Sequence, residues 1–323
     1  MQRSRTRGPV FAGLVYCGIL NCMNKSTAIY QRRINQVIDY LNAHLDRSVS
    51  LKELASVAFF SPFHFHRIFV AIMGETVNAF TTRQRIEKAA RLLRFSKKKI
   101  TEIATECGFT SPATLSRLFK QYFGISPGQY RKGEKIKNSK IRKELQPITE
   151  YHCDMTQEEL KKQFPVQIKH LPERKIAYIR VTDAFKEGLV INAFKKLIAW
   201  SKEAKLYETE TIFGMSKDDP EVTPKEKYRY EACITVPKNI NISEEGPVQV
   251  TILPSCKYAF TRVSGDINLV AEGINYLFDN WLINSAYECE TQPGLEIFLD
   301  KANVCNWSHS DLEIGIPIKV ISN

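Results

Sequence analysis

Two arginines occupy equivalent positions in an internal repeat of the sequence. Arg67 and Arg117 each lie six residues after the serine of a Ser-Pro pair, Ser61-Pro62 in the first copy and Ser111-Pro112 in the second. An arginine that projects from a helix can donate two parallel hydrogen bonds to O6 and N7 of a guanine in the major groove of DNA. The alternative for both positions is a structural arginine that pairs with a neighbouring carboxylate.

Helical spacing around these arginines separates an apolar stripe from an outward face. The stripe is Phe65, Ile68, Phe69 and Ile72 in the first copy and Leu115, Leu118, Phe119 and Tyr122 in the second. The outward residues expected to contact DNA are Phe63, His66, Arg67, Pro112, Ala113, Ser116, Arg117 and Lys120. An exposed ring such as Phe63 can touch a thymine methyl group. A core position is the alternative for Phe63, and a solvent-facing side chain without a contact is the alternative for His66.

Glu296 is a candidate for a different chemistry. The segment Leu295–Leu299 alternates, so a strand there would place Glu296 and Phe298 on one face. A carboxylate buried beside aromatic rings is unfavourable without a partner, and a cation with a flat apolar body would supply one. The other candidates are Tyr178, Tyr228 and Trp281 as ligand-binding residues, Trp200 and Trp307 as further walls, and Glu231 and Glu313 at the rim. If this face is exposed to solvent, Glu296 is only a surface carboxylate.

The arginines are positioned by a duplicated helix-turn-helix pattern. Leu51–Phe69 and Ile100–Phe119 match at a separation of 49 residues, which becomes 50 after one inserted residue. The serine of each Ser-Pro pair is an expected N-cap, and the proline suits the first helical position. Gly108 can take the positive φ of the second turn. Phe59 stands in its place in the first copy, so we expect that turn to differ.

Two longer helices complete this region. The first is expected over Ile29–Leu45. The second is expected to connect the two motifs over Val77–Arg94, with Phe80, Ile86, Ala90 and Leu93 as its inner face.

The C-terminal half contains a second repeat. Pro165–Thr182 aligns without gaps to Pro247–Ser264, with nine of eighteen residues identical. An amphipathic helix follows each copy, at Leu189–Lys205 and Leu269–Ile283. Further strands are expected at Arg229–Val236, Leu295–Leu299 and Leu312–Ile318. A duplicated β-α-β-β unit usually packs around a pseudo-twofold axis, and the groove between its halves is a natural ligand site. The alternative is a duplicated structural domain without a ligand.

Charge is distributed unevenly along the 323 residues. The net charge is +11; Lys25–Lys135 alone sums to +11, whereas Tyr151–Asn323 sums to −5. Nucleic-acid phosphates or an anionic membrane surface would attract the basic segment, and a solubilising surface is the third alternative. No apolar run in the sequence reaches the ~18–20 residues of a membrane span. Eight cysteines without a C-x-x-C pair favour buried reduced thiols over a metal site.

The region from Ile29 to Lys132 resembles the AraC/XylS family of regulators. The resemblance is carried by Leu51-x-x-Leu-Ala55, Ser61-x-x-His-x-x-Arg-x-Phe69, Ile103-Ala-x-x-x-Gly-Phe109, Ser111-x-x-x-Leu-x-Arg-x-Phe-Lys120 and Gly124-x-Ser-Pro-x-x-Tyr-Arg131. It implies sequence-specific binding of duplex DNA, with one helix of each motif in the major groove, and regulation of promoters.

The region from about Pro165 to Lys319 resembles the GyrI-like effector-binding domain. The resemblance is carried by Arg229-Tyr-x-Ala-Cys-Ile234, Trp281-Leu282, Pro293-x-Leu-Glu-Ile-Phe-Leu-Asp300 and Leu312-Glu-Ile-x-Ile-Pro317. It implies binding of amphipathic, often cationic, small molecules by a cavity that contains a glutamate, and Glu296 matches that position.

The expected fold is an all-α double helix-turn-helix domain followed by a duplicated β-α-β-β domain of α/β character. The expected divisions are an extension over 1–22, a DNA-binding domain over 23–132, a linker over 133–164 and a small-molecule-binding domain over 165–323. Three arginines before the apolar Val10–Leu20 have the layout of a signal peptide, but no clear cleavage site follows. We therefore expect translation to start at Met23.

The expected function is a cytoplasmic transcription regulator without enzyme activity, cofactor or metal. Its expected partners are double-stranded DNA, a small-molecule effector and RNA polymerase, and no membrane. The alternative is hydrolysis of a small molecule in the C-terminal domain. The sequence has no P-loop, H-E-x-x-H or G-x-S-x-G motif to favour that alternative.

Overall fold

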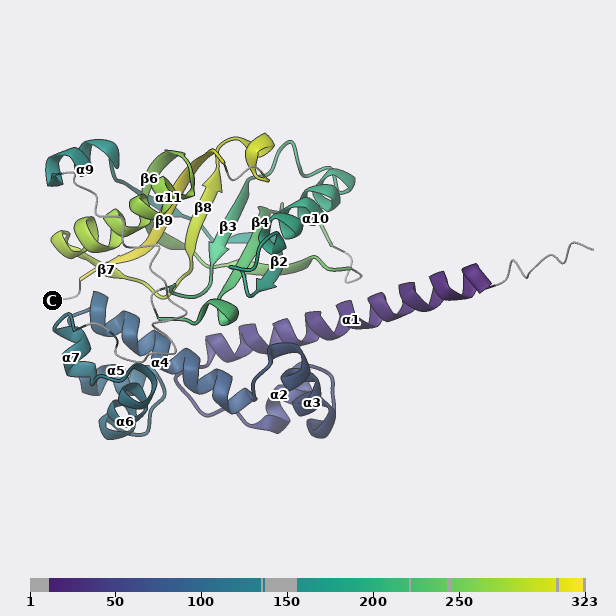
Figure 1. Cartoon of the computed structure of the whole chain (residues 1–323), viewed down its shortest axis with the longest axis horizontal. Helices are drawn as coiled ribbons and strands as arrows, with labels where there is room; N and C mark the ends of the chain where they lie inside the picture. Colours follow the sequence, from purple (N-terminus) through teal and green to yellow (C-terminus); the bar gives the residue numbers. More distant parts are fainter. Residues whose placement is uncertain are drawn as a thin grey trace, which may run out of the picture. The chain divides into compact units, whose positions relative to one another are not determined.

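The computed structural model describes residues 12–134, 136, 156–220, 222–242, 246–305 and 308–321, with side chains from residue 28 onward (Figure 1). These residues form two compact units. The first comprises the described parts of Met1–Ala43, Val49–Val77 and Ser243–Pro247; the second comprises those of His44–Ser48, Asn78–Ile242 and Val248–Asn323. Much of the predicted extension and linker, with Trp307, lies outside the described residues. The start at Met23 and the predicted domain boundaries stay predictions.

The first unit contains the helices α1 (Ala12–Ala43), α2 (Leu51–Val57) and α3 (Pro62–Met73). Ile34, Val37, Ile38 and Leu41 of α1 are at most 1% exposed, as their helical spacing predicts. The helix begins earlier than the predicted Ile29 and ends two residues before the predicted Leu45. The Ser61 side chain caps α3 by accepting a hydrogen bond from the His64 backbone N–H, as expected.

The turn between α2 and α3 corrects one expectation. Phe59 adopts φ +54°, in the left-handed region, as Gly108 does in the second motif with φ +70°. The backbone N–H of Phe60 and that of Phe109 each donate to the carbonyl five residues earlier. The two turns therefore have the same geometry, although this region costs a non-glycine residue roughly 1–2 kcal/mol.

The surroundings explain why glycine is needed in only one of these turns. A Cβ at Gly108 would lie 2.1 Å from the carbonyl oxygen of Leu45. The Phe59 side chain is instead 75% exposed, so its ring meets no such obstacle.

The helices of the second motif are α4 (Val77–Phe95), α5 (Ile100–Glu106), α6 (Pro112–Phe123) and α7 (Pro127–Arg131). The predicted connecting helix is confirmed within one residue, and its predicted inner face is buried. Ser111 caps α6 through the Thr114 N–H, and Pro112 occupies the first turn. Each motif thus follows from local signals at its Ser-Pro pair.

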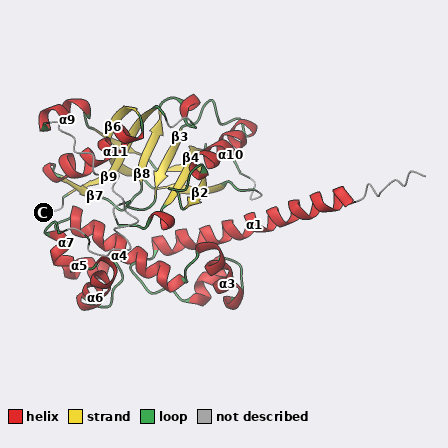
Figure 2. Cartoon of the chain, in the orientation of Figure 1, coloured by secondary structure: helices red, strands yellow, loops and turns green. Residues whose placement is uncertain are grey.

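The rest of the second unit is built on one antiparallel sheet (Figure 2). Its strands are β1 (Gln167–Leu171), β2 (Arg174–Thr182), β3 (Ile212–Ser216), β4 (Arg229–Thr235), β5 (Gln249–Leu253), β6 (Cys256–Gly265), β7 (Tyr287–Cys289), β8 (Gly294–Phe298) and β9 (Ser310–Val320). The order is β1-β6-β9-β8-β3-β4-β2-β5, with β7 paired to β9. This order is symmetrical about the central β8–β3 pair.

Each face of the sheet has its own apolar core. The helices α10 (Leu189–Glu203) and α11 (Ile267–Asn275) cover one face, which we call the helix face. A π-helical segment (Tyr276–Trp281) and a 3-10 turn (Leu282–Asn284) extend α11. The residues buried on the opposite face include Tyr178, Phe213 and Leu295. Short 3-10 turns occur at Lys225–Lys227 and Lys301–Asn303.

The predicted β-α-β-β pattern is incomplete, because each half begins with two strands. Pro172 separates β1 from β2, and Pro254 separates β5 from β6. Proline lacks the N–H that continues a ladder, so each predicted long strand breaks there. The first strand of each half then pairs with the other half, β1 with β6 and β5 with β2.

The predicted linker also contains a helix, α9 (Gln157–Gln163), capped by Thr156. Among the described residues, no single helix is long and apolar enough to cross a membrane. The helices α2 and α3, which meet at a 77° bend, have that length and apolar composition only when they are taken together.

Candidate functional site

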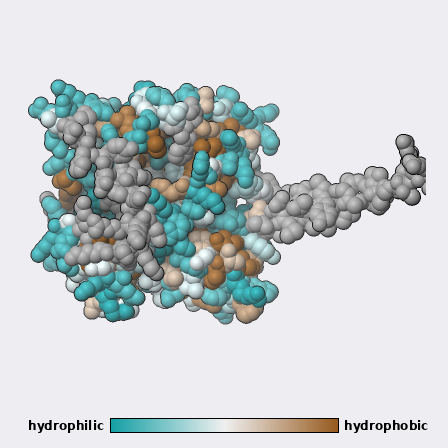
Figure 3. Space-filling view, viewed as in Figure 1, coloured by the Kyte–Doolittle hydropathy of each residue, from teal (hydrophilic) through white to brown (hydrophobic). Residues whose placement is uncertain are grey.

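Helix α3 exposes the residues that the sequence predicted to contact DNA. Phe63 is 67% exposed, and His66 and Arg67 are also exposed, whereas Phe65 and Phe69 are buried. A core position for Phe63 therefore does not hold. The Arg67 guanidinium lies 5.7 Å from the centre of the Phe63 ring. Figure 3 shows apolar side chains among polar ones on the visible surface of this motif.

Helix α6 has the same arrangement. Pro112, Ala113, Arg117 and Lys120 are exposed and Ser116 is half-buried. In the part of the chain that the structure describes, neither Arg67 nor Arg117 has a hydrogen-bonded or ion-paired partner. The alternative of a carboxylate-paired arginine is therefore not seen here, and both guanidinium groups are free to meet a ligand.

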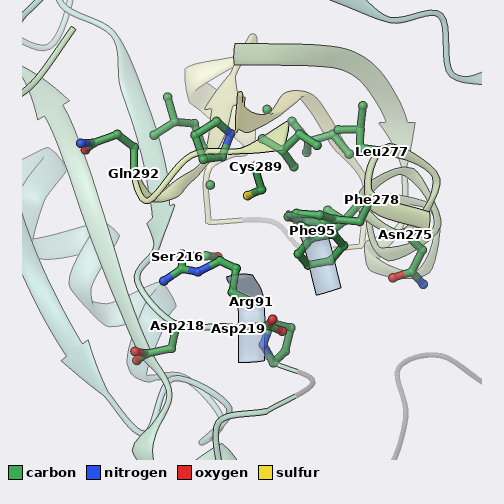
Figure 4. Close-up of a pocket in the computed structure, with 18 of the residues that line it drawn as sticks. Arg91, Phe95, Ser216, Asp218, Asp219, Asn275, Leu277, Phe278, Cys289 and Gln292 are labelled. Carbon is green, nitrogen blue, oxygen red and sulfur yellow. The ribbon is translucent and has the colours of Figure 1, made fainter. Parts of the chain in front are cut away.

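A cavity of about 130 Å³ lies in the second unit, between α4 and the helix face of the sheet. Its apolar lining includes Phe95, Leu277, Phe278, Ile314 and Ile316, and its charged lining is Arg91, Arg94, Asp218, Asp219, Asp279 and Glu296. Figure 4 shows Arg91 and Phe95 reaching into it from α4. A cavity of ~150 Å³ holds benzene, so this one is close in size to a single aromatic ring.

Glu296 lies beside the centre of the sheet, where β8 pairs with β3. It is opposite Gly214 on β3 and accepts a 2.6 Å hydrogen bond from the Tyr230 hydroxyl. A Cβ at position 214 would lie 1.7 Å from that hydroxyl oxygen, so the glycine makes the contact possible. Burial raises the pKa of Glu296, and the hydrogen bond from Tyr230 opposes this rise.

Of the other predicted ligand residues, some line the cavity and some do not. Tyr228 lines the cavity with Glu296. Phe298 shares the helix face but is buried in the core, with its ring 5.2 Å from that of Phe194. Trp281 stacks on Tyr287 at 5.9 Å and is not among the described lining residues.

Tyr178 corrects an expectation, because it lies on the opposite face of the sheet from Glu296. It is buried there with Phe213 and Leu295 and donates a 2.8 Å hydrogen bond to Gln249. The rim candidates also differ from prediction: Glu231 is buried in an ion pair with Arg180, and Glu313 pairs with Lys169 at 2.6 Å.

Sequence reasoning missed the contribution of α4. Arg91, Arg94 and Phe95 line the cavity although they lie about 200 residues before Glu296 in the chain. Arg94 Nη2 lies 2.6 Å from Asp279 Oδ1, and the Phe95 ring lies 5.0 Å from the Phe278 ring. The only signal was that an arginine and a phenylalanine end an otherwise amphipathic helix.

A buried polar network also joins α4 to the sheet. Arg229, 2% exposed, forms an ion pair with Asp218 and donates a 2.6 Å hydrogen bond to Oε1 of Gln84. Gln84 in turn donates to Glu87, which pairs with Arg83. Burial raises the pKa of Glu87 to about 7, although Arg83 opposes the rise. Since Asp218 also lines the cavity, the network and the cavity share a wall.

The cavity offers little for covalent chemistry. Burial raises the pKa of the Cys289 thiol to about 12, which keeps it protonated near neutral pH. The described lining residues include no histidine, and no group of three metal-ligating side chains occurs among the described residues.

The described chain has two helix-turn-helix motifs and a sheet domain whose cavity is lined by both charged and apolar side chains. These features define a helix-turn-helix protein with a small-molecule domain of its own. Residues 164–319 match the family described as GyrI-like small molecule binding domain, and residues 54–133 match the family described as helix-turn-helix domain. The chain belongs to the AraC-type family of helix-turn-helix transcription regulators and carries a GyrI-like domain.

Individual relatives match the helix-turn-helix region. The probable transcriptional regulator LumQ of Photobacterium leiognathi is 34% identical over 31% of this chain and 41% of its own length. The transposon Tn10 TetD protein of Escherichia coli is 34% identical over 31% of this chain and 73% of its own length. The solved DNA-binding domain of AdpA, in complex with a target DNA, is 32% identical, covers 31% of this chain and 90% of the domain, and has a TM-score of 0.30. The match to LumQ thus spans less than half of that relative.

The raised pKa of Glu296 predicts a pH-dependent effect of Glu296→Gln on stability. The pKa of Glu296 in the folded protein lies above its ordinary value of 4.5. As the pH rises from 4.5 to this folded pKa, the glutamate lowers the free energy of unfolding, because the unfolded chain loses its proton more readily. Its replacement by glutamine should therefore raise the melting temperature at pH 8, and the gain should vanish by pH 4.5. The gain is about 1.4 kcal/mol for each tenfold difference between the folded and unfolded proton affinities.

Thermal unfolding across this pH range checks the prediction, with the exposed Glu187→Gln as the matched control. A lower melting temperature for Glu296→Gln at pH 8 would contradict it.

Proposed function

We propose that this chain is a sequence-specific DNA-binding transcription regulator whose action is changed by a small amphipathic cation bound at Glu296. We place its action in the cytoplasm at promoters, with RNA polymerase as a partner. We also keep the predicted domain divisions and propose that the two halves of the sheet domain arose by duplication. The symmetrical strand order supports that origin.

The DNA-binding part of the proposal rests on α3 and α6. Each helix turns its apolar stripe inward and leaves an unpaired arginine at the same repeat position on its exposed side. An unpaired guanidinium can donate its hydrogen bonds to a guanine edge without first breaking an ion pair. The DNA-contacting residues that we propose are those predicted from the sequence.

The ligand-binding part rests on Glu296, and this observation carries the proposal. Its carboxylate projects into an apolar, ring-lined cavity where its described hydrogen-bond donor is the neutral hydroxyl of Tyr230. Such a site favours a cation with a flat body, because charge pairing and ring faces both stabilise it. Of the predicted residues, we propose that Glu296 and Tyr228 contact the ligand directly.

Helix α4 supplies a physical route between the two functions. It forms one wall of the cavity, and the same helix leads into the second helix-turn-helix motif. A ligand that contacts Arg91 or Phe95 changes the free energy of this helix's contact with the sheet domain. For hydrolysis, the rival function, the loss of turnover in Glu296→Gln would be the distinguishing result.

Selection of bound duplexes from a random pool tests the DNA-binding part. Because one chain carries both helices, the selected site should be asymmetric. Arg67→Ala and Arg117→Ala should each cost ~1–3 kcal/mol of affinity and relax specificity at one base position. Lys52→Ala, an exposed change on α2, is the matched control. Equal losses on all sequences would mean that the arginines do not read bases.

Calorimetric titration with benzyltrimethylammonium, a cation with one aromatic ring, tests the ligand-binding part. We expect the full chain to bind it and Glu296→Gln to weaken binding at least tenfold, ~1.4 kcal/mol, since the charge pairing is lost. The exposed Glu187→Gln should leave the affinity unchanged. Equal affinities of Glu296→Gln and the unmodified chain would remove Glu296 from the site.

A further inference from the structure

Arg91 is a charged group in the cavity wall that the proposed cation site does not use. It is half-buried, lines the cavity from α4, and has no hydrogen-bonded or ion-paired partner among the described residues. Figure 4 shows its side chain extending from α4 to the side of the cavity where Ser216 lies. A guanidinium carries five donors in a fixed planar fork, so an unpaired one beside apolar surface favours an anionic acceptor.

The neighbouring arginines differ from Arg91 in this respect. Arg94, which lines the same cavity, is paired with Asp279 at 2.6 Å. Arg229 is paired with Asp218, and Arg83 with Glu87. Asp279, Asp218 and Glu87 are therefore each paired with an arginine other than Arg91. Asp219 also lines the cavity; burial raises its pKa, and the nearby positive charges of Arg91 and Arg94 oppose this rise.

The sheet register places Ser216 near Glu296. Ser216 is opposite Gly294, and Gly214 is opposite Glu296, so Ser216 and Glu296 are diagonal neighbours on β3 and β8. Diagonal neighbours on one face of a sheet are about 7–8 Å apart. Arg91 and Glu296 line this one cavity of about 130 Å³, so a positive and a negative group both face it. Phe95, Phe278 and Ile314 supply the apolar lining of the same cavity.

We propose that the effector is a small zwitterion with a flat apolar body, whose cationic group pairs with Glu296 and whose carboxylate or similar anionic group pairs with Arg91. This inference rests on the proposed function of Glu296 as a cation site. It adds an anion subsite that α4 provides, so the ligand bridges the sheet and the helix that leads into the second motif. A planar carboxylate matches the guanidinium fork with two parallel hydrogen bonds.

Three related probes test the inference on the full chain: benzyltrimethylammonium, its 4-carboxy derivative, and benzoate. The first two share the ring and the cation and differ in the carboxylate. We expect calorimetric titration to give at least tenfold tighter binding of the zwitterion than of the cation, with benzoate the weakest. In Arg91→Ala the zwitterion should lose this advantage, while the cation keeps its affinity within about twofold. Lys97→Ala, which removes an exposed positive charge just beyond α4, should preserve the advantage.

The outcomes separate this inference from the proposed function. If the cation and the zwitterion bind the unmodified chain equally and both depend on Glu296, the anion subsite is wrong and the cation site stands. If Arg91→Ala weakens both probes alike, Arg91 supports the fold of the cavity and the inference is also wrong. If neither probe binds, or if Glu296→Gln affects neither, the proposed cation site fails and the inference fails with it.

Discussion

The buried guanidinium of Arg229 is the group on which the second unit's arrangement depends most. Its Nε and its backbone N–H each donate a 2.8 Å hydrogen bond to Asp218, and Nη2 donates to Gln84 of α4. The Phe80 ring, also from α4, lies 5.4 Å from it. A buried charge is tolerated only where its partners are in place. Asp218 of the sheet domain neutralises this charge, and Gln84 and Phe80 of α4 add a further hydrogen bond and a ring contact.

The same contact that satisfies Arg229 brings the end of α4 to the cavity, where Phe95 meets Phe278 and Arg94 meets Asp279. The helix that closes the proposed effector site is thus also the first helix of the second motif. In the proposed function, a ligand at this site and DNA at α6 both act on α4, and two ligands that bias one element must affect each other's affinity equally.

The sequence predicted the features that local chemistry decides. Ser61 and Ser111 mark both helix starts, and alternation places Glu296 and Phe298 on one face. The sequence-based prediction was wrong at Phe59, where a different turn was expected. The chain reversal there requires a positive φ, and this requirement overrides the preference of a non-glycine residue for negative φ. The break at Pro172 could have been predicted, since proline interrupts a ladder. The position of Tyr178 could not, because alternation fixes faces within one strand and says nothing of the register between strands. The roles of Arg91 and Arg229 depend on a contact between distant segments, which local patterns do not encode.

The most direct test of this account is the affinity of the full chain for benzyltrimethylammonium with and without saturating amounts of its selected DNA duplex. Coupling through α4 predicts that DNA changes the dissociation constant of the probe at least fivefold, a free energy of about 1 kcal/mol, and that the probe changes DNA affinity by the same factor. Equal probe affinities for the free chain and the DNA complex would contradict the claim that α4 joins the two sites.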